Sequence, residues 1–207
     1  ASLRYDADLA PVGPLRQAVA MLLEYKVTDN NLLFGGIPVT DNRTDIVQLS
    51  GIYSGGFADS WGANTFGLRL TASPGRMTGR NKTEYFEISR ASAKADYFYG
   101  TMDLARTQPL PANFSLQVNG HLQLASGNLL GSEQLGLGGV NSVRGFNEGT
   151  VYGDQGYLLR TELHAPPLDS GSWFPFVAPS MPLDLLVFYD YGTTGNISRL
   201  TDEARWN

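Results

Sequence analysis

Apolar and polar residues alternate with a period of two along much of this chain, and no other feature restricts the fold as strongly. The clearest case is segment 114–124, where one face carries the apolar residues and glycine and the other carries Ser115, Gln117, Asn119, His121 and Gln123. Successive side chains of a β-strand point to opposite faces, so the alternation predicts a two-faced strand and not a helix. The segment is also longer than the five or six residues (about the usual length) of strands in soluble proteins.

The same alternation recurs along the rest of the chain, so the sequence predicts eight strands and no helix. The other seven strands are expected at 3–9, 18–27, 46–53, 65–72, 91–99, 157–163 and 183–191. The connections alternate in length, being short at 10–17, 55–62 and 106–113 and longer, with many Gly, Asn, Asp and Thr residues, at 28–45, 73–84 and 125–155. Connection 165–182 is long where the scheme requires a short one.

Two architectures fit these strands, a soluble β-sandwich and a transmembrane β-barrel. A sandwich buries the apolar faces, whereas a barrel turns them toward lipid and lines its lumen with polar groups. Two features favour the barrel. Ionisable residues lie within the polar faces, namely Arg69, Lys94, Asp96, Arg160, Glu162 and Asp190. Tyrosines lie near strand ends on the apolar faces, as in an interfacial aromatic girdle, namely Tyr25, Tyr53, Tyr97, Tyr99 and Tyr191.

Composition argues against several other classes of protein. The 207 residues include no cysteine, which excludes disulfides, a thiolate nucleophile and cysteine-ligated metals. Two histidines, His121 and His164, are too few for an imidazole metal cage. A net charge of −5 disfavours a nucleic-acid surface. Apolar runs reach only about six residues, well below the ~20 that a membrane helix needs. No arrangement of catalytic residues stands out, so we predict neither an enzyme nor a cofactor.

A set of linked motifs occupies the last third of the chain. Val143-Arg144-Gly145-Phe146 resembles the signature tetrapeptide of the outer-membrane assembly and secretion superfamily. Its surroundings resemble the two-partner secretion transporters of the hemolysin-activator type, called TpsB. The neighbouring motifs are Ser132-Glu133-Gln134, Leu137-Gly138-Gly139, Gly153-Asp154-Gln155-Gly156-Tyr157, Arg160-Thr161-Glu162-Leu163 and Phe188-Tyr189-Asp190-Tyr191-Gly192, the last similar to the F-x-D-x-G strand motif of the family. Their shared order makes the resemblance far more specific than one tetrapeptide.

The resemblance implies a protein of the Gram-negative outer membrane that exports a large exoprotein of the hemolysin, adhesin or haem-acquisition type. It implies contact with membrane lipid, periplasmic transport-associated domains elsewhere in the full-length protein, and no role in nucleic-acid binding. The fold would be an all-β, antiparallel transmembrane barrel of sixteen strands. Residues 1–207 would form one segment of it, about strands six to thirteen, with the signature loop 125–155 in the lumen. An open sheet has bare edges that lipid does not tolerate, so further chain or partner strands would complete it.

The residues give a physical reason for this grouping. If the apolar faces meet lipid, Glu162 and Asp190 point into the lumen from neighbouring strands. The Arg144 guanidinium can donate two parallel hydrogen bonds to a carboxylate. Gly145 allows a tight backbone beside Arg144, and the pair Gly138-Gly139 lets the loop fold back. The resemblance implies that the loop enters the barrel and that Arg144 docks on its inner wall, with Gly153, Asp154, Gly156, Phe188 and Gly192 as supporting residues.

Several alternatives remain open at this point. The chain could belong to an outer-membrane insertase of the same superfamily, or form a soluble β-sandwich binding module. It could also form a small closed barrel, which would require residues near Leu3 to pair with 183–191. In the simplest alternative, Arg144 is an exposed loop arginine, and Glu162 and Asp190 are strand carboxylates that face water.

Overall fold

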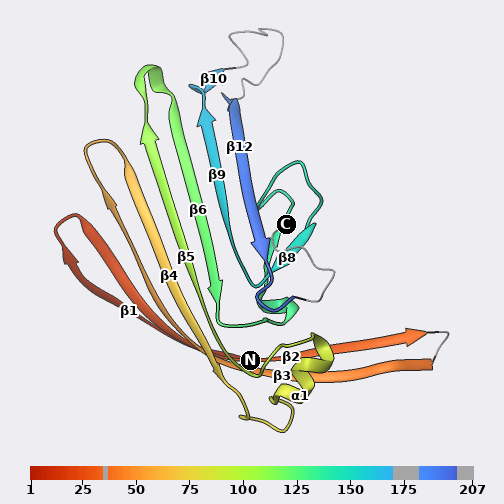
Figure 1. The fold of residues 1–207 in the computed structure, drawn as a ribbon. Helices are drawn as coiled ribbons and strands as arrows, with labels where there is room; N and C mark the ends of the chain where they lie inside the picture. Colours follow the sequence, from red (N-terminus) through yellow and green to blue (C-terminus); the bar gives the residue numbers. More distant parts are fainter. Residues whose placement is uncertain (35–36, 170–181, 200–207) are drawn as a thin grey trace.

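The computed structural model describes residues 1–34, 37–169 and 182–199 and has one large antiparallel sheet (Figure 1). Its strand order follows the chain, so each strand pairs with its sequence neighbours in the sheet. The eight strands are β1 (Ser2–Val12), β2 (Leu15–Phe34), β3 (Ile37–Ala58), β4 (Ala63–Pro74), β5 (Asp96–Pro109), β6 (Ser115–Ala125), β9 (Gln155–His164) and β12 (Leu186–Gly195). The predicted all-β, antiparallel architecture is therefore confirmed.

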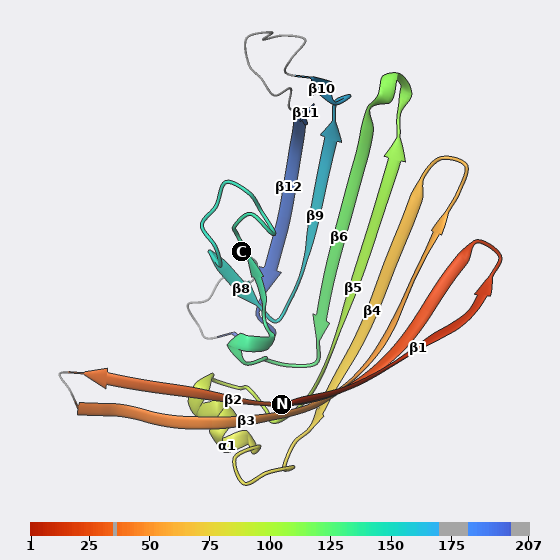
Figure 2. The same cartoon turned by 180° about the vertical axis from the view of Figure 1, so that it is seen from behind.

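Short and long connections lie at opposite ends of this sheet (Figures 1 and 2). The turns that join β1 to β2, β3 to β4 and β5 to β6 share one end. The long connections 75–95, between β4 and β5, and 126–154, between β6 and β9, share the other. Connection 165–182, which the sequence singled out, contains the short strands β10 (Leu168–Asp169) and β11 (Pro182–Leu183). Residues 170–181 of that connection lie outside the described part of the chain.

The two faces of the sheet differ in the sense expected of a membrane barrel. The apolar side chains of the strands lie on the outer face, opposite the face against which loop 126–154 packs, and they are exposed; Leu104, for example, is 49% exposed. The opposite face carries Gln48, Ser50 and Thr71, each fully buried. A sandwich would bury the apolar face, so this alternative is wrong. The small closed barrel is wrong as well, because within the described residues β1 pairs with β2 and not with β12.

One predicted strand faces the wrong way. The sequence places a strand at 91–99 with Tyr97 and Tyr99 toward lipid, but β5 begins at Asp96 and both tyrosines point inward, each 7% exposed. Lys94 consequently lies before the strand, and Asp96 lies at its first residue. The reason is a small apolar cluster on the polar face, which takes the tyrosines inward. It consists of Ile46, Phe86, Ala93, Ala95, Tyr97, Tyr99, Leu129 and Leu130.

The expectation of no helix is also wrong. Helix α1 (Thr83–Ser89) lies within connection 75–95 and inserts Phe86 into the apolar cluster. Seven residues show too few turns for a helical period to be visible in the sequence, and such a short helix depends on tertiary packing for its stability. Among the described residues, no helix has the length and apolar character needed to cross a membrane.

The hairpin of β2 and β3 is much longer than predicted. Segment 28–45 was expected to be a loop, but the two strands continue to pair as far as Phe34 and Ile37. In both views this hairpin extends beyond the other strands at the end of the long connections (Figures 1 and 2). Segment 28–45 lacks the apolar alternation of the membrane region, so the periodicity alone ended both strands too early.

Adjacent residues of β5 provide a test of which face meets lipid. Leu104 points outward, and Ala105 belongs to the inner face of β5, because it alternates in step with Tyr99 and Asp103. We expect Leu104→Arg to lower the free energy of unfolding in lipid vesicles by about 2–4 kcal/mol, because a guanidinium on the lipid face of a barrel is costly near the bilayer midplane. Ala105→Arg places the same group in the polar interior and should cost much less. Urea titration of the refolded full-length protein measures both values; equal losses would contradict the assignment of the faces.

Candidate functional site

The loop between β6 and β9 lies against the inner face of β9 and β12 (Figure 1). It contains a 3-10 turn, η2 (Gly131–Glu133), and a ribbon formed by β7 (Leu135–Leu137) and β8 (Val151–Gly153). The tip is closed by its own hydrogen bonds. Gly139 N donates to Phe146 O at 3.0 Å, and Ser142 Oγ donates to Gly138 O at 2.8 Å. The loop therefore presents Arg144 from a defined turn.

Arg144 joins the loop to both strands of the wall. Its Nε and Nη2 donate to the two carboxylate oxygens of Asp190, each at 2.6 Å, and its Nη1 donates to Glu162 Oε1 at 2.5 Å. The backbone N–H of Arg144 donates to Asp190 Oδ2 at 3.0 Å. Bidentate, charge-assisted hydrogen bonds of this kind are the strongest that side chains make. The hydrogen bonds to Asp190, supplemented by the one to Glu162, raise the pKa of the Arg144 guanidinium above its ordinary value.

The strand register explains why these groups meet. Phe188 lies directly opposite Glu162, and Asp190 lies directly opposite Arg160. All four side chains belong to one face, because alternate residues of a strand share a face. The guanidinium carbon of Arg144 lies 3.8 Å from the centroid of the Phe188 ring, a cation–π contact. The phenylalanine of the F-x-D-x-G motif is thus the platform on which Arg144 rests between its two carboxylates.

Two further side chains complete the site, and the sequence analysis gave neither a role. Arg160 donates to Val140 O at 3.3 Å and to Asn141 O at 3.1 Å, and so holds the other side of the loop tip. His164 Nε2 lies 3.0 Å from Glu162 Oε2. A signal was available for both, since residues 160, 162 and 164 alternate onto one face of β9.

The motif glycines occupy positions that disfavour a side chain, by the backbone angle at Gly145 and by close neighbours at the others. Gly145, next to Arg144, has φ +92°, which L-residues rarely adopt. On β12, a Cβ atom at Gly192 would lie 2.9 Å from Leu137 Cδ1 and 3.3 Å from Val143 Cγ2, so this glycine lets the loop approach the wall. A Cβ atom would also meet neighbouring atoms at the remaining motif glycines, Gly138, Gly139, Gly153 and Gly156. Phe146 follows this turn and is exposed.

The structure does not bring Asp154 to the Arg144 site. Asp154 lies at the end of the loop, fully buried, and forms an ion pair with Arg90 of connection 75–95. At the start of the loop, the buried carboxylate of Glu133 accepts hydrogen bonds from Lys26 Nζ at 3.0 Å and Tyr99 Oη at 2.8 Å. The loop is therefore fixed by carboxylates at both ends and by a guanidinium at its tip.

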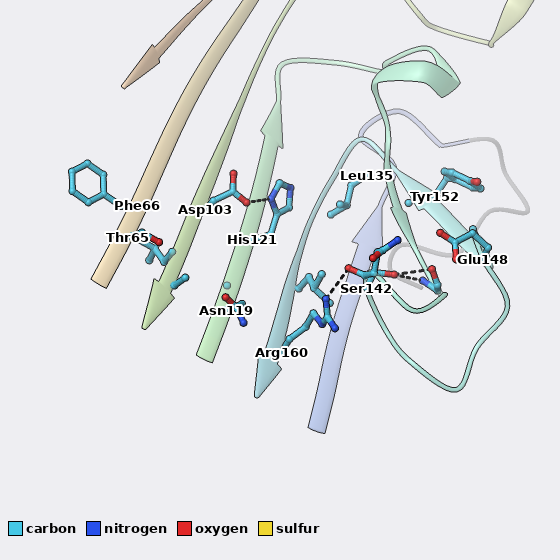
Figure 3. A pocket seen from close by; sticks show the side chains of 18 residues that line it. Thr65, Phe66, Asp103, Asn119, His121, Leu135, Ser142, Glu148, Tyr152 and Arg160 are labelled. Atoms are coloured by element: carbon cyan, nitrogen blue, oxygen red, sulfur yellow. Dashed lines mark hydrogen bonds and ion pairs between the residues drawn. The ribbon is translucent and has the colours of Figure 1, made fainter. Parts of the chain in front are cut away.

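A cavity of about 590 Å³, lined by polar and apolar side chains, separates the loop from strands β4, β5 and β6 (Figure 3). On the strand side, His121 Nδ1 lies 2.7 Å from Asp103 Oδ1, and Asn119 is a neighbour. On the loop side lie Glu148 and Tyr152. Within the described residues, no cluster of His, Cys, Asp and Glu side chains is arranged to hold a metal ion. The arrangement as a whole is a loop docked in a polar interior.

Comparisons with known proteins agree on one family. The family model described as haemolysin secretion/activation protein ShlB/FhaC/HecB matches residues 19–204. The heme/hemopexin transporter protein HuxB of Haemophilus influenzae is 33% identical over 89 residues, which cover 43% of this chain and 14% of HuxB. HuxB of strain 86-028NP gives the same values. The solved structure of CdiB from Escherichia coli is similar with a TM-score of 0.75 and 18% identity, over 99% of this chain and 36% of CdiB.

The docking of the loop can be tested by Arg144→Lys. A lysine retains the charge but cannot bind both oxygens of Asp190 and also reach Glu162, since it lacks the planar fork. We expect cleavage within residues 135–150 by an added protease to become roughly tenfold faster, because charge-assisted hydrogen bonds are lost. Mass spectrometry of the fragments measures this rate. Arg16→Lys, on β2 and outside the site, is the control; equal cleavage of the two variants would show that Arg144 does not hold the loop.

Proposed function

Because the chain belongs to the haemolysin secretion/activation (ShlB/FhaC/HecB) family, we propose that it exports a large secreted protein across the Gram-negative outer membrane by two-partner secretion. Members of this family are outer-membrane transporters of the TpsB type, and this chain is part of the transmembrane β-barrel of such a transporter. It spans 14% of the length of the curated relatives that it matches. The activity of the whole protein is therefore a proposal built on this part.

The observation that carries the proposal is the position of Arg144 on the inner wall. A loop that served only outside the membrane would not need a guanidinium bound to Asp190 and Glu162 on strand faces that point away from lipid. The loop instead occupies space that a passing polypeptide would need. This geometry supports a transporter in which the loop controls or guides passage.

The interior suits a polypeptide that crosses in an extended form. The cavity beside the loop has a mixed lining, in which the polar and charged groups of Asn119, His121 and Arg160 alternate with apolar side chains such as Leu135 and Leu158. The polar groups can exchange hydrogen bonds with any backbone, and the apolar side chains can contact apolar residues of the same segment. The loop and wall residues would position the conduit without forming or breaking a covalent bond. Family members are transporters and not enzymes, and we propose that this chain has no catalytic activity.

The cargo and partners follow from the same reasoning. We expect a large exoprotein of the hemolysin, adhesin or haem-acquisition type; HuxB is by its name a heme/hemopexin transporter, which makes the haem-acquisition class one candidate. Membrane lipid would contact the exposed apolar face, and periplasmic transport-associated domains would receive the cargo. The insertase alternative is disfavoured by the family match and by the motif Gly153-Asp154-Gln155-Gly156.

Secretion by the full-length transporter tests the proposal. Large proteins released into the medium are compared between cells that express the wild-type protein, no transporter, or the double variant Glu162→Gln/Asp190→Asn. Since this variant removes both charges that hold Arg144, we expect release to fall about tenfold while the cargo accumulates in the periplasm.

Arg16→Lys provides the control and should secrete as wild type does. If loss of the transporter left secretion unchanged but impaired the assembly of other outer-membrane proteins, the insertase alternative would replace this proposal.

A further inference from the structure

A buried carboxylate far from the Arg144 site connects three separate segments of the chain. Asp154 is 0% exposed and pairs with both terminal nitrogens of Arg90, which follows α1. Its oxygens also accept from Leu129 N at 2.9 Å and from Ile197 N, beyond β12, at 3.0 Å. Burial of a carboxylate is costly unless charge and hydrogen bonds compensate it, and here both do.

The guanidinium of Arg90 also forms several hydrogen bonds. Besides Asp154, its guanidinium donates to Leu129 O and, at 2.9 Å, to Asn196 Oδ1. Arg90 belongs to the connection between β4 and β5, whereas Asp154 directly precedes β9 and Asn196 directly follows β12. In the sheet, β6 lies between the pair β4 and β5 and the pair β9 and β12. The ion pair therefore reaches over the inner side of β6 and joins strands that are not neighbours.

Arg90 and Asp154 fasten one side of a distinct structure that we call the inner cap, formed by residues 75–95. Its other side is fastened to β3, where Asn81 Nδ2 donates to Asp45 O at 2.9 Å and Thr78 Oγ1 donates to Asp45 Oδ2 at 2.8 Å. Phe86 of the cap packs in one cluster with Leu129 of the signature loop and with Tyr97 and Tyr99 of β5. The cap thus covers the polar face at the end of the long connections, where α1 lies beside β3 in both views (Figures 1 and 2).

We propose that the inner cap is a gate over this end of the barrel and that Arg90 and Asp154 form its latch. This inference rests on the proposed export function and assigns the latch residues a positioning role, distinct from the Arg144 site. The cap is held to β3 by Asn81 and Thr78, and to the signature loop and the end of β12 by the Arg90 guanidinium, which binds Asp154 and Asn196. Release of Arg90 would remove this charged contact and leave, on the side of the signature loop, the contacts of Asn128 with Ala91 and Ala93. The attachment to β3 would then serve as the hinge.

Channel recordings of the purified full-length transporter in a planar bilayer test the latch. Arg90→Gln removes the ion pair, and we expect openings at least about tenfold more frequent than in wild type, because loss of one partner from a buried pair is strongly destabilising. Arg80→Gln removes an arginine of the same connection whose guanidinium lies over the Tyr85 ring, and it should record as wild type. A heat-dependent shift in gel mobility establishes that each variant is folded. Arg90→Gln openings equal to those of Arg80→Gln would overturn the latch.

A reversible lock separates a moving gate from a fixed part of the structure. Ala93 of the cap forms an isolated β-bridge with Asn128 of the signature loop, and bridged residues lie about 5 Å apart, within the range that a disulfide spans. These 207 residues contain no cysteine that would compete for the pair. We expect Ala93→Cys/Asn128→Cys to stop release of exoprotein when oxidised and to restore it when a reductant is added. Each single cysteine variant should secrete normally under both conditions. Secretion by the oxidised pair at the wild-type rate would show that the cap does not open and would overturn the proposal.

These measurements also separate the latch from the export function. If the wild-type transporter released no protein, the proposed function would fail, but the bilayer comparison of Arg90→Gln with Arg80→Gln would still decide whether the pair keeps the channel closed. If Arg90→Gln did not fold, the disulfide pair would test the gate in a protein that retains Arg90.

Discussion

Backbone hydrogen bonding in lipid is the constraint from which the rest of this structure follows. A strand that crosses the hydrocarbon region must satisfy its N–H and C=O groups in neighbouring strands, because no water is available there. The meander from β1 to β12 meets this requirement with a ladder between each pair of neighbours. Within the membrane region, alternation then places apolar side chains toward lipid and polar side chains inside. Polar side chains are concentrated in the interior because they are costly on the lipid-facing surface.

A polar interior requires that its charges compensate one another. Arg69 Nη2 lies 2.6 Å from Glu24 Oε2, Lys26 pairs with Glu133, and Arg144 pairs with Asp190 and Glu162. Three of these four pairs connect a strand to the signature loop. The same need for compensation that makes the wall stable therefore also holds the loop in the lumen. A loop bound by charge-assisted hydrogen bonds can be displaced by charged side chains of a passing polypeptide, which offer equivalent bonds, more readily than by its neutral backbone.

The long connections show how a barrel acquires a small apolar core inside its polar lumen. Tyr97 and Tyr99 continue the alternation of β5 but point inward, because α1 supplies Phe86 and the loop supplies Leu129 as partners. Their hydroxyl groups remain satisfied, since Tyr97 donates to Gln48 and Tyr99 donates to Glu133. This end of the barrel is thus built from packing as well as from hydrogen bonds, in contrast to the Arg144 site, which charge-assisted hydrogen bonds hold.

The sequence by itself determined the parts that depend on local periodicity and on short motifs. The alternation predicted the eight strands of the large sheet and most of the outward apolar faces, because residues two apart on one strand share a face wherever the strand lies. The motifs, through their resemblance to the family, implied that Arg144 docks on the wall that carries Glu162 and Asp190. Only the tertiary structure decided the direction of Tyr97 and Tyr99, the helix α1 and the pairing of Arg90 with Asp154. These features depend on contacts between residues that are far apart in the sequence, which no local pattern encodes; Arg90 and Asp154, for example, are 64 residues apart. A period-two alternation does not say which face of a strand points inward. For Tyr97 and Tyr99, the side chains that they pack against decide the direction.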